Sequence, residues 1–318
     1  MAPRADAPGG VDAMPDPANH PAAAADQGPP TLSAKPRYVL TSLQQRLLSA
    51  AVLLPIALLA LWAGGRVWAA FVSVFALVMI WEWCAICDIR RDTQIPWPSG
   101  RLALPSIIAM ATSCLALIPT VMPMPFFPPA WFSVLVGFVL TTACAWPGKG
   151  RGGLWLALGL GYIVPTSLAA VAIRAQSGDG LATEIWIVAL VVAADTGAYM
   201  AGRLIGGPKL VPRISPNKTW AGLVGAILAA AAVGWITSLV ITLPSPWLLM
   251  MISGALAVIE QAGDLFESFL KRHFGVKDSG RIIPGHGGVL DRVDGLLAVT
   301  LAVAGIESFI GGGILGWL

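Results

Sequence analysis

Charged residues are scarce in this chain. They make up 12% of its 318 residues, whereas hydrophobic residues make up 56% and the mean hydropathy is +0.75. Soluble domains usually carry about 25% charged residues, so this composition excludes an ordinary soluble protein. It is typical of a protein that crosses the bilayer several times, and we expect an all-α, polytopic membrane fold.

Cysteine is also rare, and the four cysteines all lie inside apolar segments. Cys84 and Cys87 have the spacing of half a zinc or redox site, but no second cysteine pair completes it, so a structural role is expected. The chain lacks an apolar core near its N-terminus, which argues against a signal peptide. Residues 1–35, rich in Ala, Pro, Asp and Gly, are expected to form a disordered cytoplasmic tail.

Apolar runs near the ~20 residues needed to span a bilayer recur after this tail. They predict nine membrane-spanning helices within a single catalytic domain over residues 36–318. The predicted spans are 47–64, 67–87, 103–122, 130–146, 153–173, 184–202, 221–242, 246–265 and 295–316.

Lys and Arg gather on one side of these nine spans. If the N-terminus is cytoplasmic, all of the 20 Lys and Arg residues except Arg66 and Arg174 fall in cytoplasmic segments. Cytoplasmic loops of membrane proteins carry such an excess, so the bias supports both the count of spans and the orientation. The two largest cytoplasmic loops then follow spans six and eight.

Span six contains polar residues at a depth where each needs a partner. Its end reads A-A-D-T-G-A-Y-M-A-G-R, residues 193–203, and includes Asp195, Tyr199 and Arg203. Small residues at helical spacing in this stretch favour close packing against a neighbouring helix. Asp195 therefore serves either a functional site or a packed helix pair, and we favour the functional reading.

The loop after span six continues as K-L-V-P-R-I-S-P-N-K-T-W, residues 209–220. Ser215, Lys218 and Thr219 place hydroxyl and ammonium groups just before the next helix. Such donors suit phosphate oxygens. An ordinary positively charged cytoplasmic loop is the alternative reading.

The loop after span eight adds acidic residues, which membrane topology does not require. Asp264 and Glu267 are three residues apart and therefore share a helix face, and Asp291 and Asp294 repeat this spacing. Two carboxylate pairs at the ends of adjacent helices can together bind Mg²⁺, a cation that prefers oxygen ligands. Pairing of the same acids with nearby arginines is the alternative.

Glycines surround the histidine of P-G-H-G-G, residues 284–288. Because glycine has no side chain, backbone N–H groups there can closely approach an anion. Gly287 and Gly288 are therefore expected to contact substrate. For His286 we favour a part in loop geometry over acid–base chemistry.

These residues carry a family resemblance. Residues 268–294 resemble the signature of the phosphatidate cytidylyltransferases, the CDP-diacylglycerol synthases. The stretches D-T-G-A-Y-M-A-G-R and I-S-P-N-K-T-W are similar to other blocks of that family in the same order, so the resemblance covers about residues 190–295. Ala221 departs from the family, which commonly has an acidic residue there, and we assign it no role.

The resemblance implies that the cytidylyl group of CTP is transferred to phosphatidate, giving CDP-diacylglycerol and pyrophosphate, with Mg²⁺ and optionally a second cation as cofactors. The expected catalytic residues are Asp264, Lys271, Arg272, His286, Asp291 and Arg292. The expected substrate-binding residues are Asp195, Tyr199, Arg203, Ser215, Lys218, Thr219, Lys277, Asp278, Gly287 and Gly288. The expected metal ligands are Asp264, Asp291 and Asp294.

The expected partners are CTP, phosphatidate and membrane lipids, without nucleic acid, and small-residue helix faces permit a homodimer. The expected location is a bacterial inner membrane, with the active site on the cytoplasmic side. Another CTP-dependent lipid enzyme, such as a dolichol kinase, is one alternative. A secondary transporter is the other: Glu260 and Glu307 lie deeper in the spans, but the repeated halves typical of transporters are absent from the sequence.

Overall fold

The structure, a computed structural model, separates into two units, Met1–Val39 and Leu40–Leu318. It describes residues 42–87, 102–122, 128–145, 152–280, 282–283 and 287–318, all of which belong to the second unit. The tail predicted for residues 1–35 lies outside the described residues.

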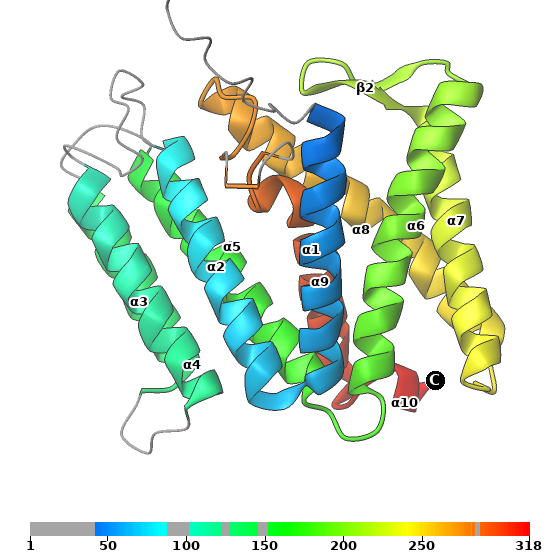
Figure 1. Cartoon of the computed structure of the whole chain (residues 1–318), viewed down its shortest axis with the longest axis horizontal. Coiled ribbons are helices and arrows are strands. Elements are labelled where there is room, and N and C mark those ends of the chain that lie inside the picture. Colours follow the sequence, from blue (N-terminus) through cyan, green and yellow to red (C-terminus); the bar gives the residue numbers. More distant parts are fainter. Residues whose placement is uncertain (1–41, 88–101, 123–127, 146–151, 281, 284–286) are drawn as a thin grey trace, which may run out of the picture. The chain divides into compact units, whose positions relative to one another are not determined.

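Helices dominate the described residues (Figure 1). The long ones are α1 (Ser42–Ala63), α2 (Gly65–Cys87), α3 (Ala103–Val121), α4 (Ala130–Ala145), α5 (Gly152–Arg174), α6 (Gly180–Leu204), α7 (Trp220–Val240), α8 (Pro246–His273) and α9 (Leu290–Ile310), followed by the short α10 (Ile314–Trp317). Strands β1 (Lys209–Val211) and β2 (Ser215–Thr219) form one antiparallel hairpin. The predicted all-α membrane fold is confirmed.

Seven of the described helices, α2, α3 and α5 to α9, are long and apolar enough to cross a membrane. Helices α1 and α4 contain shorter apolar stretches, Ala51–Ala63 and Ala130–Cys144. The protein is therefore an integral membrane protein. The count of nine crossings and the cytoplasmic N-terminus stay predictions.

Each predicted span coincides with one of the long helices, and the bounds differ most at the start of α1, the end of α8 and both ends of α9. Helix α8 continues to His273, whereas the predicted span ends at residue 265, and α9 begins at Leu290 rather than at residue 295. Hydropathy detects only the part of a helix that lies in lipid, and a helix can continue into the polar interface with its backbone hydrogen bonds intact. The acidic residues of α8 and α9 therefore lie on ordered helix.

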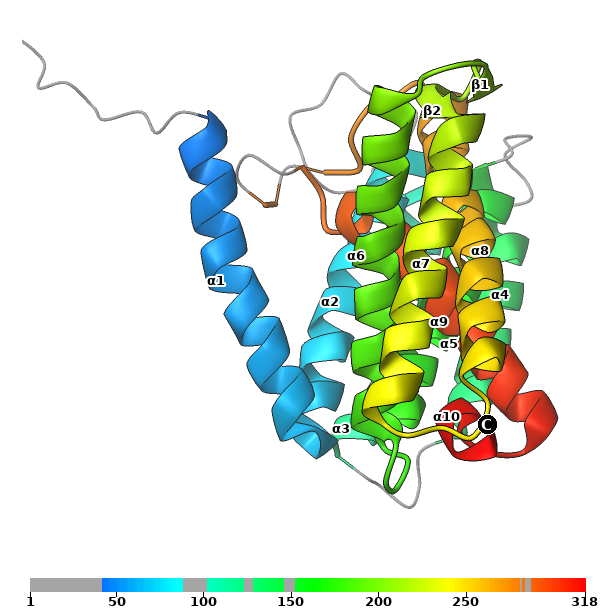
Figure 2. The same ribbon diagram turned by 90° about the vertical axis from the view of Figure 1, so that its right-hand side faces the viewer.

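Helices α6, α7 and α8 pack side by side, and α6 and α7 approach to backbone contact (Figure 2). A Cβ atom added at Gly197 of α6 would lie 2.5 Å from the carbonyl oxygen of Gly225 in α7, so no side chain fits there. Small residues at helix interfaces in membranes permit this approach. A second core forms between α2, α3, α5 and α9, where Trp83 and Leu160 are fully buried.

The hairpin between α6 and α7 lies at the same end of the helices as the loop between α8 and α9 (Figures 1 and 2). In the hairpin, Lys209 pairs with Thr219 and Val211 with Ser215. The α5–α6 and α7–α8 turns lie at the opposite end. The fold thus brings together the two loops in which the sequence places the site.

Candidate active site

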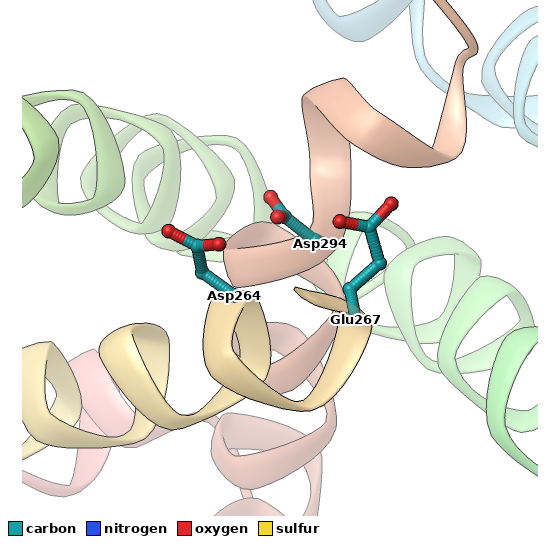
Figure 3. A group of neighbouring side chains, drawn as sticks. All are labelled: Asp264, Glu267 and Asp294. Carbon is teal, nitrogen blue, oxygen red and sulfur yellow. The ribbon is translucent and has the colours of Figure 1, made fainter. Parts of the chain in front are cut away.

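Three carboxylates from α8 and α9 form the centre of the candidate site. One oxygen from each of Asp264, Glu267 and Asp294 lies within 4.8 Å of the others. Figure 3 shows Asp264 and Glu267 on one helix, with Asp294 reaching between them from the other. Helix α9 can approach α8 this closely because Gly263 of α8 has no side chain. A Cβ atom there would lie only 3.0 Å from the backbone oxygen of Asp294.

This group of carboxylates fits a hard divalent cation. Mg²⁺ is usually held by a few carboxylates together with water and substrate phosphates. Within the group, Glu267 Oε1 is buried and has no hydrogen-bond partner among the described residues. A buried acceptor without a donor costs free energy unless another group satisfies it. Mg²⁺ binding, predicted through Asp264 and Asp294, stays a prediction, and the structure adds Glu267 to the candidate ligands.

Two lysines flank the carboxylates. Lys218 Nζ, from β2, lies 2.6 Å from Asp264 Oδ2 and donates a hydrogen bond of 2.8 Å to Gln261 Oε1. Lys271 Nζ, from α8, lies 2.6 Å from Glu267 Oε2 and 2.7 Å from Asp291 Oδ1. Both lysines are mostly buried, with 16% and 13% of their side chains exposed. The hairpin and α8 thus both supply positive charge to one acidic centre.

Asp291, a predicted metal ligand, is engaged with protein groups. Its carboxylate pairs with Lys271 and accepts hydrogen bonds from the backbone N–H groups of Ser279, at 2.9 Å, and Gly288, at 3.0 Å. The N–H of Gly288, predicted to contact substrate, thus donates to a carboxylate of the protein itself, and substrate contact at Gly287 and Gly288 stays a prediction. Asp291 lies outside the group of three carboxylates, and its part in metal binding remains untested.

Glu82 of α2, which the sequence did not single out, binds the same loop through hydrogen bonds. Its side chain is fully buried and accepts hydrogen bonds from the N–H groups of Val289, at 2.9 Å, and Leu290, at 2.8 Å, where α9 begins. The first N–H groups of a helix lack partners within the helix, so an acceptor there stabilises its start. One signal was available, because an acidic residue within an apolar span is by default a functional candidate.

Replacing Glu82 by Gln is expected to destabilise the start of α9 and to lower turnover. The amide offers one acceptor oxygen instead of two, so a buried N–H loses its partner, at a cost of about 1–3 kcal/mol. Thermal unfolding in detergent and turnover per folded protein measure the two effects. Glu307→Gln is the matched control, because Glu307 also accepts two hydrogen bonds, from Gln176 and the N–H of Ile314, at the opposite end. Equal turnover in both variants would contradict a role for Glu82 in the site.

A polar pocket opens beside the carboxylates, between α6, the hairpin and α8. It has a volume of about 470 Å³, and its lining includes Asp195, Tyr199, Arg203, Lys218 and Asp264. Its size suits a small-molecule ligand, for which sites of ~300–1,000 Å³ are usual. The structure therefore brings predicted binding residues of the first loop to a predicted catalytic carboxylate of the second.

The remaining predicted residues bond to backbone groups, lie outside the pocket lining or are exposed. Thr219 lines the pocket, but its hydroxyl accepts the capping hydrogen bond from the N–H of Gly222 at 3.0 Å. In the loop between α8 and α9, the N–H of Gly287 donates to the backbone oxygen of Ile283 at 3.2 Å. Ser215 lies in β2, outside the pocket lining. The exposed residues are Arg272, Lys277, Asp278 and Arg292. His286 lies outside the described residues.

The deeper carboxylates have partners of their own. Glu260 is buried and accepts a hydrogen bond of 2.8 Å from Gln261 Nε2, and Glu307 accepts one of 2.7 Å from Gln176 Nε2. These contacts agree with a packing role in the helix bundle. Cys84 and Cys87 are free and buried, as a structural role requires.

Comparison with known proteins defines the class of this site. A model of the cytidylyltransferase family matches residues 44–309. A phosphatidate cytidylyltransferase of Brucella suis biovar 1 is 36% identical over 274 residues, which cover 82% of this chain and 92% of that protein. Proteins of the same name from Staphylococcus epidermidis and Bacillus subtilis are 48% identical over 122 residues and 46% identical over 130 residues, respectively, covering 38% and 41% of this chain and 47% and 48% of those proteins.

The site thus belongs to an enzyme that transfers a nucleotidyl group. The chain is a member of the cytidylyltransferase family. The resemblance and the enzyme class predicted from the motifs are confirmed, and membership of this family speaks against the transporter alternative.

Proposed function

We propose that this protein transfers the cytidylyl group of CTP to phosphatidate. A phosphate oxygen of phosphatidate attacks the α-phosphorus of CTP, the bond from that phosphorus to the bridging oxygen breaks, and pyrophosphate leaves with the bonding electrons. The observation that carries this proposal is the cluster of Asp264, Glu267 and Asp294, flanked by Lys218 and Lys271, at one end of membrane-embedded helices. The name of the relatives, phosphatidate cytidylyltransferase, supports phosphatidate as the acceptor.

The chain's own residues suit this reaction. The attacking phosphate is already anionic, so no activated serine or cysteine is required. Lys218 and Lys271 are placed to offset negative charge and to orient the phosphates for in-line attack. Mg²⁺, held by the three carboxylates, would neutralise charge on the triphosphate. A second cation remains an expectation from the resemblance.

The direct test is CTP-dependent pyrophosphate release by purified protein in detergent micelles. Phosphatidate is expected to support release, whereas diacylglycerol is not, because it lacks the attacking phosphate oxygen. Pyrophosphate release that is as fast with diacylglycerol, or without any lipid, as with phosphatidate would refute phosphatidate as the acceptor.

Lys218→Ala is expected to raise the KM for CTP by at least about tenfold or to abolish turnover. The residue lines the polar pocket, and its ammonium group lies 2.6 Å from Asp264, so its removal takes a cation from the proposed phosphate site. Steady-state kinetics against CTP provide the measurement. The matched control is Lys209→Ala, a change at an exposed lysine of the same hairpin outside the pocket lining. Unchanged CTP kinetics in Lys218→Ala would leave the hairpin as an ordinary basic loop.

The proposed location is a bacterial inner membrane with the site on the cytoplasmic side. The gathering of Lys and Arg in the predicted cytoplasmic segments supports this orientation. A homodimer is also part of the proposal. In a variant without native cysteines, Lys209→Cys is expected to react with an impermeant thiol reagent only from the cytoplasm, and Ser177→Cys only from the other side. Both positions are exposed and lie at opposite ends of the helices. The reverse labelling pattern would invert the topology.

A further inference from the structure

An apolar groove lies between α1 and α2, outside the polar pocket. It has a volume of about 580 Å³ and is lined by Val52 of α1 and by Val74, Phe75 and Val78 of α2, among others. Of its described lining residues, Ser49 alone has a polar side chain. A nucleotide or a metal ion would find almost no hydrogen-bonding or charged partner there. The groove therefore suits an aliphatic ligand.

Arg174 of α5 fixes the C-terminal end of α1, where its Nε donates to the backbone oxygen of Leu61 at 2.7 Å and its Nη2 to that of Trp62 at 3.0 Å. Gly64 and Gly65, with φ of +62° and +48°, then turn the chain into α2. From this turn α1 diverges from α2 toward the end that holds the α8–α9 loop (Figure 2).

The segment between α8 and α9 takes part in both the groove and the candidate active site. Ile282, Ile283 and Val289 of the α8–α9 loop line the groove, while the N–H of Val289 donates to Glu82 at 2.9 Å. Two residues beyond Val289, Asp291 pairs with Lys271 at 2.7 Å. One short segment is therefore apolar toward the groove and polar toward the site. A ligand with an aliphatic tail and a phosphate head matches both sides of it.

Both walls of the groove carry exposed apolar side chains. Val52 of α1 is 51% and Val74 of α2 59% exposed, and α2 is long and apolar enough to cross a membrane, so Val74 suits contact with lipid tails. A lipid can therefore enter the groove from the bilayer without passing through water.

We propose that the α1–α2 groove binds an acyl chain of the lipid substrate and directs its phosphate toward Lys271 and the carboxylate cluster. This inference rests on the proposed function, because it takes the acceptor to be an anionic phospholipid. It assigns a substrate-binding role to α1 and α2, which lie outside the sequence motifs of the two polar loops.

Filling the groove tests the proposal. Val52→Trp and Val74→Trp place large rings on its two walls. The measured quantity is the ratio of kcat/KM for dioleoyl phosphatidate to kcat/KM for dihexanoyl phosphatidate, whose short chains need little of the groove. We expect each variant to lower this ratio by about tenfold or more, because several methylene groups lose their apolar contacts.

Matched controls carry the same substitution outside the groove. Leu59→Trp on α1 and Val67→Trp on α2 change residues that are 64% and 56% exposed and do not line it. Their ratios are expected to equal that of the wild type. Wild-type ratios in both groove variants would overturn the proposal. Failure of the wild type on both lipids would instead refute the proposed function.

A second measurement covers the case in which the groove variants fail to fold. Wild-type protein is irradiated with phosphatidate that carries a diazirine near the middle of one acyl chain, and the labelled peptides are identified by mass spectrometry. Labelling is expected in α1 and α2 beside Val52 and Val74, with competition by excess dioleoyl phosphatidate but not by phosphatidylcholine. Absence of label from these segments, or equal competition by both lipids, would overturn a specific acyl site.

Discussion

Replacement of Asp264 by Asn is expected to reduce turnover by on the order of 10²-fold or more, with normal expression and folding. The substitution keeps the shape of the side chain but removes the charge from a carboxylate, one oxygen of which lies within 4.8 Å of an oxygen of Glu267 and of Asp294. Mg²⁺ tolerates little distortion of its octahedral shell, so the remaining activity should also require a higher Mg²⁺ concentration. Turnover measured against Mg²⁺ concentration tests both effects.

Two comparisons make this test specific. Glu267→Gln and Asp294→Asn are expected to behave like Asp264→Asn, because all three belong to one cluster. Asp179→Asn makes the same chemical change just before α6, at the opposite end of the helices, and is expected to leave turnover unchanged. Near-normal turnover in all three cluster variants, at the ordinary Mg²⁺ optimum, would remove the metal centre from the account.

Replacement of Lys271 by Met is expected to have the second large effect, on both stability and turnover. The ammonium group bridges Glu267 and Asp291, whose side chains are only 4% and 5% exposed. Removing one partner of a buried ion pair leaves uncompensated charge and costs roughly 3–5 kcal/mol. The thermal unfolding midpoint in detergent should therefore fall. Turnover should fall with it, because Asp291, which accepts hydrogen bonds from the loop between α8 and α9, loses its ion pair with α8.

Lys209→Met provides the control for Lys271→Met. Lys209 is exposed in β1, and the structure records no ion pair for it among the described residues. Loss of an exposed lysine usually changes stability by at most about 1 kcal/mol. If Lys271→Met matched this control in both unfolding midpoint and turnover, the ion pairs of Lys271 would be energetically unimportant.

Features set by local spacing could be predicted from the sequence. Asp264 and Glu267 share a helix face because they are three residues apart, and the structure places both in the carboxylate cluster. The helices also follow from apolar runs. Their ends do not, because the apolar signal of α8 stops where lipid stops while the helix continues to His273.

Features set by contacts between distant segments could not be predicted in this way. Glu82 meets Val289 and Leu290 across more than two hundred residues of sequence, and no local pattern reports such a contact. Asp291 has the same spacing from Asp294 as Glu267 has from Asp264, yet it turns to Lys271 and two backbone amides. Spacing identified the acidic residues of α8 and α9, but the fold determines which of them face one another.

The most direct test of the central claim, cytidylyl transfer to phosphatidate, is the fate of the phosphorus atoms of CTP. Purified protein is incubated with phosphatidate and CTP that is radioactive at either the α- or the γ-phosphorus. We expect the α label in a lipid product that is cleaved to CMP and phosphatidate, and the γ label in pyrophosphate. Transfer of the γ label to lipid would identify a kinase, and no lipid-bound label from either CTP would contradict the account.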